Sequence, residues 1–558
     1  MELRQELIEI IRQEEQVILA SFPLERRLAV MEISRAMDSF WVSINNSTEP
    51  LDDSHPVAQF IMFGLNKALS LFMDESCKYP SFPLMRSTDE LQRWADSVLQ
   101  HCGRLGICEH LLEICRIGLA ELRRDQPRQY RFSFDAESIG AEAYEATNFA
   151  WFKNYVSNQQ EAQMKILKSK RAKIWKMMSK KVRPWNKHFI QYDTNPEIDS
   201  YYEMDGILYA QLMYGQDSFP GDAKFGGKEF NLYRAAVGVL TGWSFKHLGF
   251  CAQLVKKHPE LDWRNITTIP QHFDVVAEEL ATALEVDLES AKQAMEAIML
   301  TVENKRIHCS VAGNFVAPIF IEAGQGRIIC PTWGALSHPF QFMLDELKRR
   351  YRSDWDRAVD SREQVFREEL YLLFPQSRFI RIHRSINVKV RGSVLTDIDA
   401  MVLDRETGLV ALFQLKWQDF FRKSMRKRES QKKNILYSGN QWVERISNWL
   451  SCNDCLSIGR VLGFNRGDTE KIKGFRLFVI GRNSAHFSGP GKPDDRAAWG
   501  IWFQLLRFIE DMTDPSDPIN HLFLKLIDDS PLKKENPQVA SEEFEIGSAK
   551  IILDPIGQ

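Results

Sequence analysis

Two acids and a Gln-x-Lys lie at opposite ends of a 20-residue segment, DIDAMVLDRETGLVALFQLK, which begins at Asp397 and ends at Lys416. Every second residue of a β-strand points to the same face, so Asp397 and Asp399 share one face, as do Gln414 and Lys416. The intervening DRETG predicts a turn, with a glycine where a positive φ is favoured. A hairpin folded at this turn brings Asp399 opposite the neighbourhood of Gln414. The polar groups then gather on one side of an apolar ribbon.

These polar side chains need partners, because burying an unpaired polar group among apolar residues costs a few kcal/mol. Oxygen ligands around Mg²⁺ would satisfy that need, since magnesium takes carboxylates, amide or backbone oxygens and waters. A lysine beside such a metal can orient water and stabilise negative charge on a phosphate. The alternative is a surface hairpin with an ordinary Asp–Lys ion pair.

The flanking sequence predicts the elements that hold this hairpin. Residues 354–374 form an amphipathic helical pattern, and a strand is expected over residues 378–390. After the hairpin, residues 438–450 carry tryptophan and isoleucine at helical spacing, and residues 475–480 form an apolar strand pattern. The predicted order is therefore helix, three strands, helix, strand.

This order, with an acid and a Gln-x-Lys on consecutive strands, resembles the PD-(D/E)xK nuclease superfamily. It is most similar to the Mrr-like restriction branch, in which glutamine replaces the middle acid. The resemblance covers roughly residues 350–485. It implies that Asp399 is the metal-binding acid, that Gln414 is the middle residue and a second metal ligand, and that Lys416 is the lysine. Asp397 would be an accessory acid.

The resemblance also implies a glutamate on the first helix, for which Glu363 is the first choice and Glu368 the second. The implied cofactor is Mg²⁺, with Mn²⁺ as an alternative, and the implied partner is DNA. The chain departs from the family pattern at two points. Gln414 is neutral and binds metal less strongly than a glutamate would, and Thr396 stands where the family has proline. A catalytically inactive copy of the fold therefore stays open.

Two basic segments bear on nucleic-acid binding, because lysine and arginine neutralise phosphates. The segment RKSMRKRESQKK starts six residues after Lys416 and has seven cations and one acid. We expect it to contact phosphates through Arg422, Lys423, Arg426, Lys427, Arg428, Lys432 and Lys433. The second segment, residues 165–187, has ten cations, no acids and two tryptophans. A solvated helix face is the simpler interpretation of the second segment.

Composition limits the class of protein without identifying it. The chain has 558 residues, a net charge of −3 and 44% hydrophobic residues, which suffices for several buried cores. It lacks the uninterrupted apolar run of about 18 residues that a membrane span needs, and it has no secretory signal pattern at its start. We therefore expect a cytoplasmic protein with no membrane partner. The nine cysteines show no disulfide framework, and zinc at Cys452–Cys455 or near His101 is disfavoured.

The pattern along the chain predicts a multidomain protein. Residues 1–300 form a large, mainly α-helical N-terminal region for recognition or regulation, with a subdomain break near 190–230. Residues 301–345 are expected to be a short β connector. Residues 346–510 would form a C-terminal α/β restriction-endonuclease-like domain with a central mixed β-sheet, followed by an extension over 511–558.

Two functions of different classes follow. The first is a metal-dependent DNA endonuclease in bacterial restriction or anti-phage defence, with DNA repair as another setting. The second is a catalytically inactive nuclease-fold protein that binds nucleic acid or assembles with a partner protein or a second copy of itself. Loss of cleavage on removal of metal or of Lys416 would distinguish the first from the second.

Overall fold

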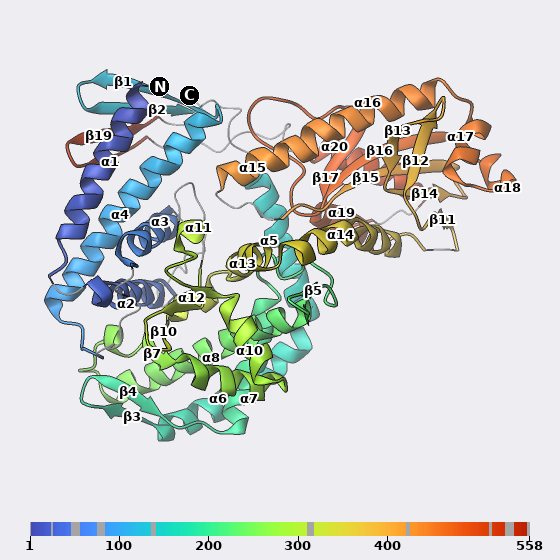
Figure 1. The fold of residues 1–558 in the computed structure, drawn as a ribbon. Coiled ribbons are helices and arrows are strands. Elements are labelled where there is room, and N and C mark those ends of the chain that lie inside the picture. Colours follow the sequence, from blue (N-terminus) through green and yellow to red (C-terminus); the bar gives the residue numbers. More distant parts are fainter. Residues whose placement is uncertain are drawn as a thin grey trace.

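Helices build most of one lobe of the protein, and a mixed sheet builds the other (Figure 1). This computed structural model describes residues 2–23, 26–45, 56–74, 77, 84–134, 141–309, 317–375, 377–419, 424–512, 516–530 and 541–554. The molecule is a multidomain protein of helices and several sheets, as the sequence predicts. No described helix has the length and apolarity needed to cross a membrane.

The helical lobe is built from helices packed around three apolar cores. Its longer helices are α1 (Glu2–Ala20), α2 (Arg26–Asn45), α3 (Pro56–Phe72), α4 (Asp89–Arg116), α6 (Glu161–Lys181), α7 (Pro196–Ala210), α8 (Phe230–Lys257), α9 (Phe273–Leu284), α10 (Leu288–Glu296) and α13 (Phe340–Arg350). Its short helices are α11 (Lys305–His308), α12 (Thr332–Leu336) and the 3-10 turn Trp263–Asn265. Helices α9 and α10 form a pair joined by a short turn at residues 285–287.

Helix α4 illustrates how local sequence sets these elements. Thr88 caps its N-terminus by accepting a hydrogen bond from the backbone N–H of Leu91 at 3.4 Å. Helix α3 crosses it so closely that a side chain at Gly64 would collide with the carbonyl oxygen of Leu99. A glycine is therefore required at this crossing.

Two sheets tie distant parts of the chain into the helical lobe. The first joins residues 120–134 to the C-terminal strands in the order β1 (Ala120–Gln126), β2 (Gln129–Phe134), β19 (Ala549–Leu553) and β18 (Glu542–Ile546). It lies beside α1 and α4, with the termini close together (Figure 1). The extension expected over residues 511–558 thus ends in an antiparallel hairpin, whose strand β19 pairs in parallel with β2.

The second sheet has the order β7 (Ile269–His272), β10 (Arg327–Cys330), β9 (Phe320–Glu322) and β8 (Met299–Leu300). Its strands come from both sides of the boundary expected at residue 300. The strands of the expected connector are therefore paired with strands of the helical region. Two small hairpins complete the lobe, namely β3 (Val182–Trp185) with β4 (Phe189–Tyr192), and β5 (Lys224–Phe225) with β6 (Lys228–Glu229).

The other lobe has a five-stranded mixed sheet in the order β11 (Phe379–Arg381), β14 (Ala400–Asp404), β15 (Leu409–Lys416), β16 (Gly474–Gly481) and β17 (Ala497–Ile501). Strand β14 is antiparallel to both of its neighbours, β11 and β15. Strands β15, β16 and β17 run parallel to one another. Helices cover both faces, so β14 is buried along its whole length.

One face of this sheet packs against α14 (Arg352–Leu372), α19 (Trp502–Glu510) and α20 (Pro518–Asp528). The opposite face packs against α16 (Ser438–Ser451) and α17 (Cys455–Leu462), which is followed by α18 (Arg466–Thr469). Helix α15 (Met425–Lys432) and a π-helical turn (Lys433–Tyr437) lead directly into α16. The predicted helices at 354–374 and 438–450 and the strand at 475–480 are thus confirmed.

The strand predicted over residues 378–390 is wrong as a single element. The chain forms β11, turns at a polar stretch that includes His383 and Arg384, and then forms β12 (Ile386–Val390). Strand β12 pairs with β13 (Ser393–Ile398) in a separate hairpin. Regular pairing also breaks at Asp399, between β13 and β14.

Helix α5 (Ala141–Gln159) belongs to the core of the mixed-sheet lobe, although it lies early in the sequence. The ring of Phe152 stacks on Phe503 of α19 with centroids 4.3 Å apart, and Phe149 lies 5.5 Å from the same ring. The two lobes are therefore interlocked through this helix, which runs between them (Figure 1).

Candidate active site at the edge of the mixed sheet

Asp399 and Gln414 meet at the edge of the sheet where β14 begins and β15 ends. Ala400 pairs with Phe413, and the Asp399 N–H donates to the Phe413 carbonyl at 3.1 Å. Asp399 is 2% exposed and Gln414 is 3% exposed. One carboxylate oxygen of Asp399 accepts hydrogen bonds from the Leu415 N–H at 2.7 Å and from the Gln414 side-chain amide. The predicted juxtaposition is therefore confirmed.

Four charged groups act on one another at this edge. Burial raises the pKa of Asp399 to about 7, and the nearby Glu363 carboxylate pushes that pKa in the same direction. Lys416 opposes the shift, and Asp397 adds to it. The structure thus brings Glu363, Asp397 and Lys416 into electrostatic range of Asp399.

Helix α14 places Glu363 near this carboxylate. Arg367 is buried, and its guanidinium donates to the backbone carbonyl of Asp399 at 3.1 Å. Residues four apart lie on the same helix face, so Glu363 is on the face that meets Asp399. Glu368, the second choice, instead pairs with His383 at 2.9 Å. The geometry therefore favours Glu363 over Glu368.

Asp397 lies in the separate β12–β13 hairpin, where it pairs with Asn387 and is exposed. Its backbone carbonyl accepts a hydrogen bond from the Trp442 indole at 2.6 Å. Its charge acts on Asp399. The prediction that the two acids share one continuous strand is wrong, because β13 ends at Ile398.

Lys416 is held in place by a residue that the sequence did not single out. The Arg482 N–H donates to the Lys416 carbonyl at 2.8 Å. The buried guanidinium of Arg482 lies 4.6 Å from the Trp417 ring centroid and pairs with Glu369 of α14 and, at 2.9 Å, with Asp217 of the helical lobe. A charged residue directly after the apolar strand β16 was the signal that could have identified it.

The donor atoms at this edge suit Mg²⁺. Asp399 supplies a carboxylate whose second oxygen accepts no hydrogen bond from the described residues. The Gln414 amide and the Glu363 carboxylate would add oxygen, the donor type that magnesium prefers. Among the described residues, no three His, Cys, Asp or Glu side chains form a group that could hold a metal by themselves. The amide, backbone oxygens, waters or a substrate phosphate would have to complete the set.

The basic segment after β15 is partly built into the fold. Arg422 and Lys423 lie outside the described residues. Arg428 and Lys432 are buried, and both donate to the Ser488 carbonyl, at 2.5 Å and 3.2 Å. These two cations hold the loop that follows β16. The expectation that they contact phosphates is therefore not met in this structure.

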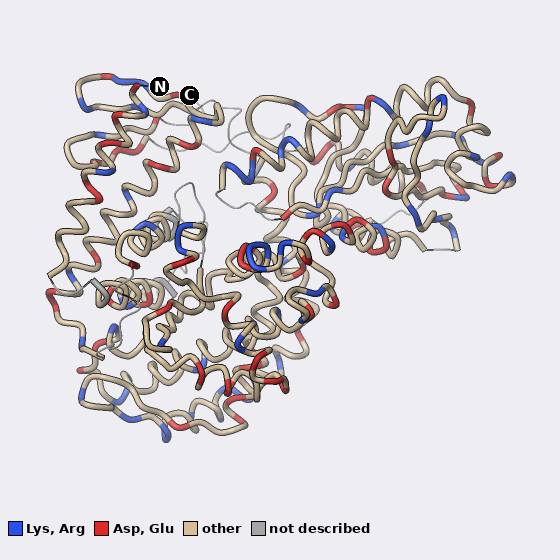
Figure 2. The backbone as a smooth tube through the Cα atoms, in the orientation of Figure 1, with Lys and Arg blue, Asp and Glu red and all other residues tan. Residues whose placement is uncertain are grey.

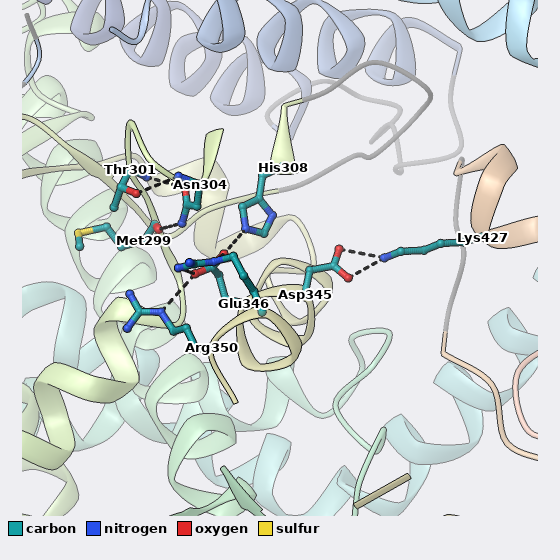
Figure 3. Close-up of polar contacts among 9 residues, drawn as sticks. Met299, Thr301, Asn304, His308, Asp345, Glu346, Arg350 and Lys427 are labelled. Carbon is teal, nitrogen blue, oxygen red and sulfur yellow. Dashed lines mark hydrogen bonds and ion pairs between the residues drawn. The ribbon is translucent and has the colours of Figure 1, made fainter. Parts of the chain in front are cut away.

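The remaining cations of that segment divide into two kinds. Lys427 crosses to the helical lobe, where it binds both carboxylate oxygens of Asp345 on α13 at 2.7 Å and 2.9 Å (Figure 3). Arg426 and Lys433 are exposed and have no acidic partner among the described residues. They are the described cations of the segment that remain available to a substrate.

The second basic segment forms α6 and β3. Several of its cations have local partners, such as Lys173 with Glu197 at 2.5 Å and Arg183 with Asp193 at 2.8 Å. Its lysines line a solvated helix face, in keeping with the simpler interpretation of this segment. Cys452 and Cys455 are exposed free thiols.

Comparison of the chain with family models, with curated proteins and with solved structures gives no match.

Proposed function

We propose that the protein is a metal-dependent nuclease that hydrolyses phosphodiester bonds in DNA, and that its mixed-sheet lobe is a restriction-endonuclease-like domain. The main support for this proposal is the position of Asp399. This buried carboxylate accepts a hydrogen bond from Gln414, and it interacts electrostatically with Lys416 and Glu363. Within the mixed sheet, α14 is followed by β11, β14 and β15, and then by α16 and the parallel strand β16, with the separate β12–β13 hairpin inserted after β11. Apart from that hairpin, this order agrees with the nuclease resemblance.

Each residue of the candidate site has a separate role in the proposed hydrolysis. Asp399 and Gln414, with Glu363 or Asp397 in support, would hold Mg²⁺ or Mn²⁺, which supplies Lewis-acid activation of a phosphate and its attacking water. Lys416 orients that water and stabilises the charge that grows on the phosphate oxygens. Arg367 and Arg482 fix the backbone at Asp399 and at Lys416. Restriction or anti-phage defence is the proposed setting, and DNA repair is the alternative.

The second candidate is a catalytically inactive protein that uses the same fold to bind nucleic acid or to assemble with a partner. One observation favours it. The Gln414 amide donates to Asp399, and a neutral residue adds no charge for a metal.

The deciding experiment is a cleavage assay of the full chain with supercoiled, linear and single-stranded DNA, in Mg²⁺, Mn²⁺ or EDTA. We expect Asp399→Asn and Lys416→Ala to lower the cleavage rate by roughly 100-fold or more. The matched control is Lys473→Ala, which removes an exposed lysine about 26 Å away, just before the other end of β16. No cleavage by the unaltered protein, or undiminished cleavage by Lys416→Ala, would refute the catalytic proposal and favour the second candidate.

A further inference from the structure

One continuous helical rod, made of α15, the π-helical turn and α16, runs along the mixed-sheet lobe (Figure 1). Its inner face is fixed to the loops that leave the candidate active-site edge. Arg428 and Lys432 hold the loop after β16 through Ser488, and the Gln431 side chain donates to the carbonyl of Asp419, three residues after Lys416. The orientation of the rod is therefore set from that edge.

The outer face of the rod carries a stripe without acids. Its members recur every three or four residues and are exposed, so they lie on one side of the helix. They are Arg426, Ser430, Lys433, Tyr437 and Gln441. The stripe spans about 22 Å at the helical rise of 1.5 Å per residue. It offers two cations, a hydroxyl, an aromatic ring and an amide. Two exposed acids flank the stripe: Glu429, which is paired with Arg428 at 3.5 Å, and Glu444, which follows Gln441 by three residues beyond the end of the stripe.

Tyr437 is the last residue of the π-helical turn, and its side chain is 47% exposed. Such π-helical turns recur at functional sites. One edge of its ring rests against Gly491, where a side-chain carbon would lie 3.3 Å from the ring. Gly491 has a φ of +96°, which disfavours other residues, so the loop leaves room for the ring. The ring is thus supported from one side and open on another.

We infer that this stripe binds a nucleic-acid strand with unpaired bases, leading it to the candidate active-site edge. Exposed cations attract phosphates, and an exposed aromatic ring stacks on a base only where that base is not paired. The charge of the stripe and the position of Tyr437 in line with both cations favour a single strand over an intact duplex. This inference rests on the proposed function, because it names the substrate form that the same lobe takes.

The test is fluorescence anisotropy of the full-length chain with a labelled single-stranded oligonucleotide and with its duplex, in EDTA so that cleavage plays no part. We expect Tyr437→Ala to weaken single-strand binding roughly 5- to 150-fold, the range for loss of one stacked base, and Tyr437→Phe to restore it. The double variant Arg426→Gln/Lys433→Gln should lower the salt slope of the single-strand affinity by about 1.4.

The control is Lys471→Gln/Lys473→Gln, which removes two exposed lysines from the same lobe far from the stripe. The inference would be overturned if both stripe variants bound the single strand as tightly as the unaltered protein does. It would also be overturned if the control lost as much affinity as the stripe variants, or if the unaltered protein bound the duplex as tightly as the single strand. Binding to anionic vesicles but not to oligonucleotides would assign the surface to a membrane instead. Binding as predicted without any cleavage in Mg²⁺ would refute the proposed catalysis alone, and cleavage with unchanged binding would refute the stripe alone.

Discussion

Gln414 determines how a metal could be held at the sheet edge, because its side chain touches the Asp399 carboxylate directly. Its amide N–H groups satisfy that buried carboxylate without adding charge. A glutamate here would set two carboxylates in contact in a site that excludes water, and like charges disfavour ionisation of both. The natural glutamine therefore stabilises the metal-free protein at the expense of metal affinity.

This reasoning predicts the behaviour of Gln414→Glu. In EDTA the variant should be about 1–3 kcal/mol less stable than the unaltered protein, because a buried hydrogen bond is replaced by repulsion. Mg²⁺ should remove most of that loss, since a divalent cation compensates the paired carboxylates. The measurement is the thermal unfolding midpoint with and without Mg²⁺.

The control for this prediction is Gln431→Glu, which changes another buried glutamine, one that donates to the Asp419 backbone carbonyl and not to the Asp399 carboxylate. It should be destabilised equally in EDTA and in Mg²⁺. An identical response of the two variants to Mg²⁺ would show that Gln414 has no special relation to a metal.

At the scale of elements, one buried acid of α13 connects this helix to α11 in the helical lobe. Glu346 is fully buried and receives hydrogen bonds from His308 of α11 at 2.7 Å and from Arg349 (Figure 3). Arg350 also donates to it at 3.2 Å. Burial opposes its ionisation, but the hydrogen bonds from His308 and Arg349 outweigh burial and lower the pKa of Glu346 to about 2.

The lowered pKa of Glu346 predicts a pH dependence of stability. A carboxylate with a lowered folded-state pKa stabilises the fold above its ordinary pKa of 4.5, and this contribution is lost as pH falls toward about 2. At neutral pH we expect Glu346→Gln to be destabilised by about 3 kcal/mol. The difference between variant and unaltered protein should narrow below about pH 4.5. Thermal midpoints across this pH range provide the measurement, and a constant difference would contradict the assignment.

Elements whose information is local could be predicted from the sequence. Hydrophobic periodicity located α14, α16 and β16, and a two-residue repeat with a turn placed Asp399 opposite Gln414. The burial of Arg428 was not predictable in this way, because it depends on a carbonyl 60 residues away. The return of β19 to β2 and the insertion of α5 into the other lobe also depend on partners distant in sequence. Periodicity indicates that a face is buried, but it does not identify what buries it.

At the scale of the whole molecule, the two lobes meet through contacts close to the candidate active site. Arg482, which holds the Lys416 backbone, also pairs with Asp217 of the helical lobe. Lys427, at the start of the basic rod, binds Asp345 of the same lobe. The helical lobe therefore contacts both the strand that carries the lysine and the helix proposed to meet the substrate.

The Lys427 ammonium group binds both carboxylate oxygens of Asp345, as it could bind two oxygens of a phosphate. An ion pair this accessible contributes only about 0.2–1 kcal/mol to stability, so Asp345→Asn should leave folding nearly unchanged. The variant frees a cation on the rod, and we expect it to raise the affinity for a single-stranded oligonucleotide about 2- to 5-fold at low salt. Anisotropy in EDTA, with no cleavage to complicate it, measures this gain.

A change in net charge alone could also raise the affinity for the oligonucleotide. The control for this effect is Asp356→Asn, which removes an equal charge from α14. Asp356 pairs there with Arg352 at 3.0 Å. The gain from Asp345→Asn should exceed that from Asp356→Asn. It should also disappear when Lys427→Gln is added, because the freed cation is then absent. Equal gains from the two acids, or a gain that persists without Lys427, would show that the contact between the lobes does not compete with the substrate.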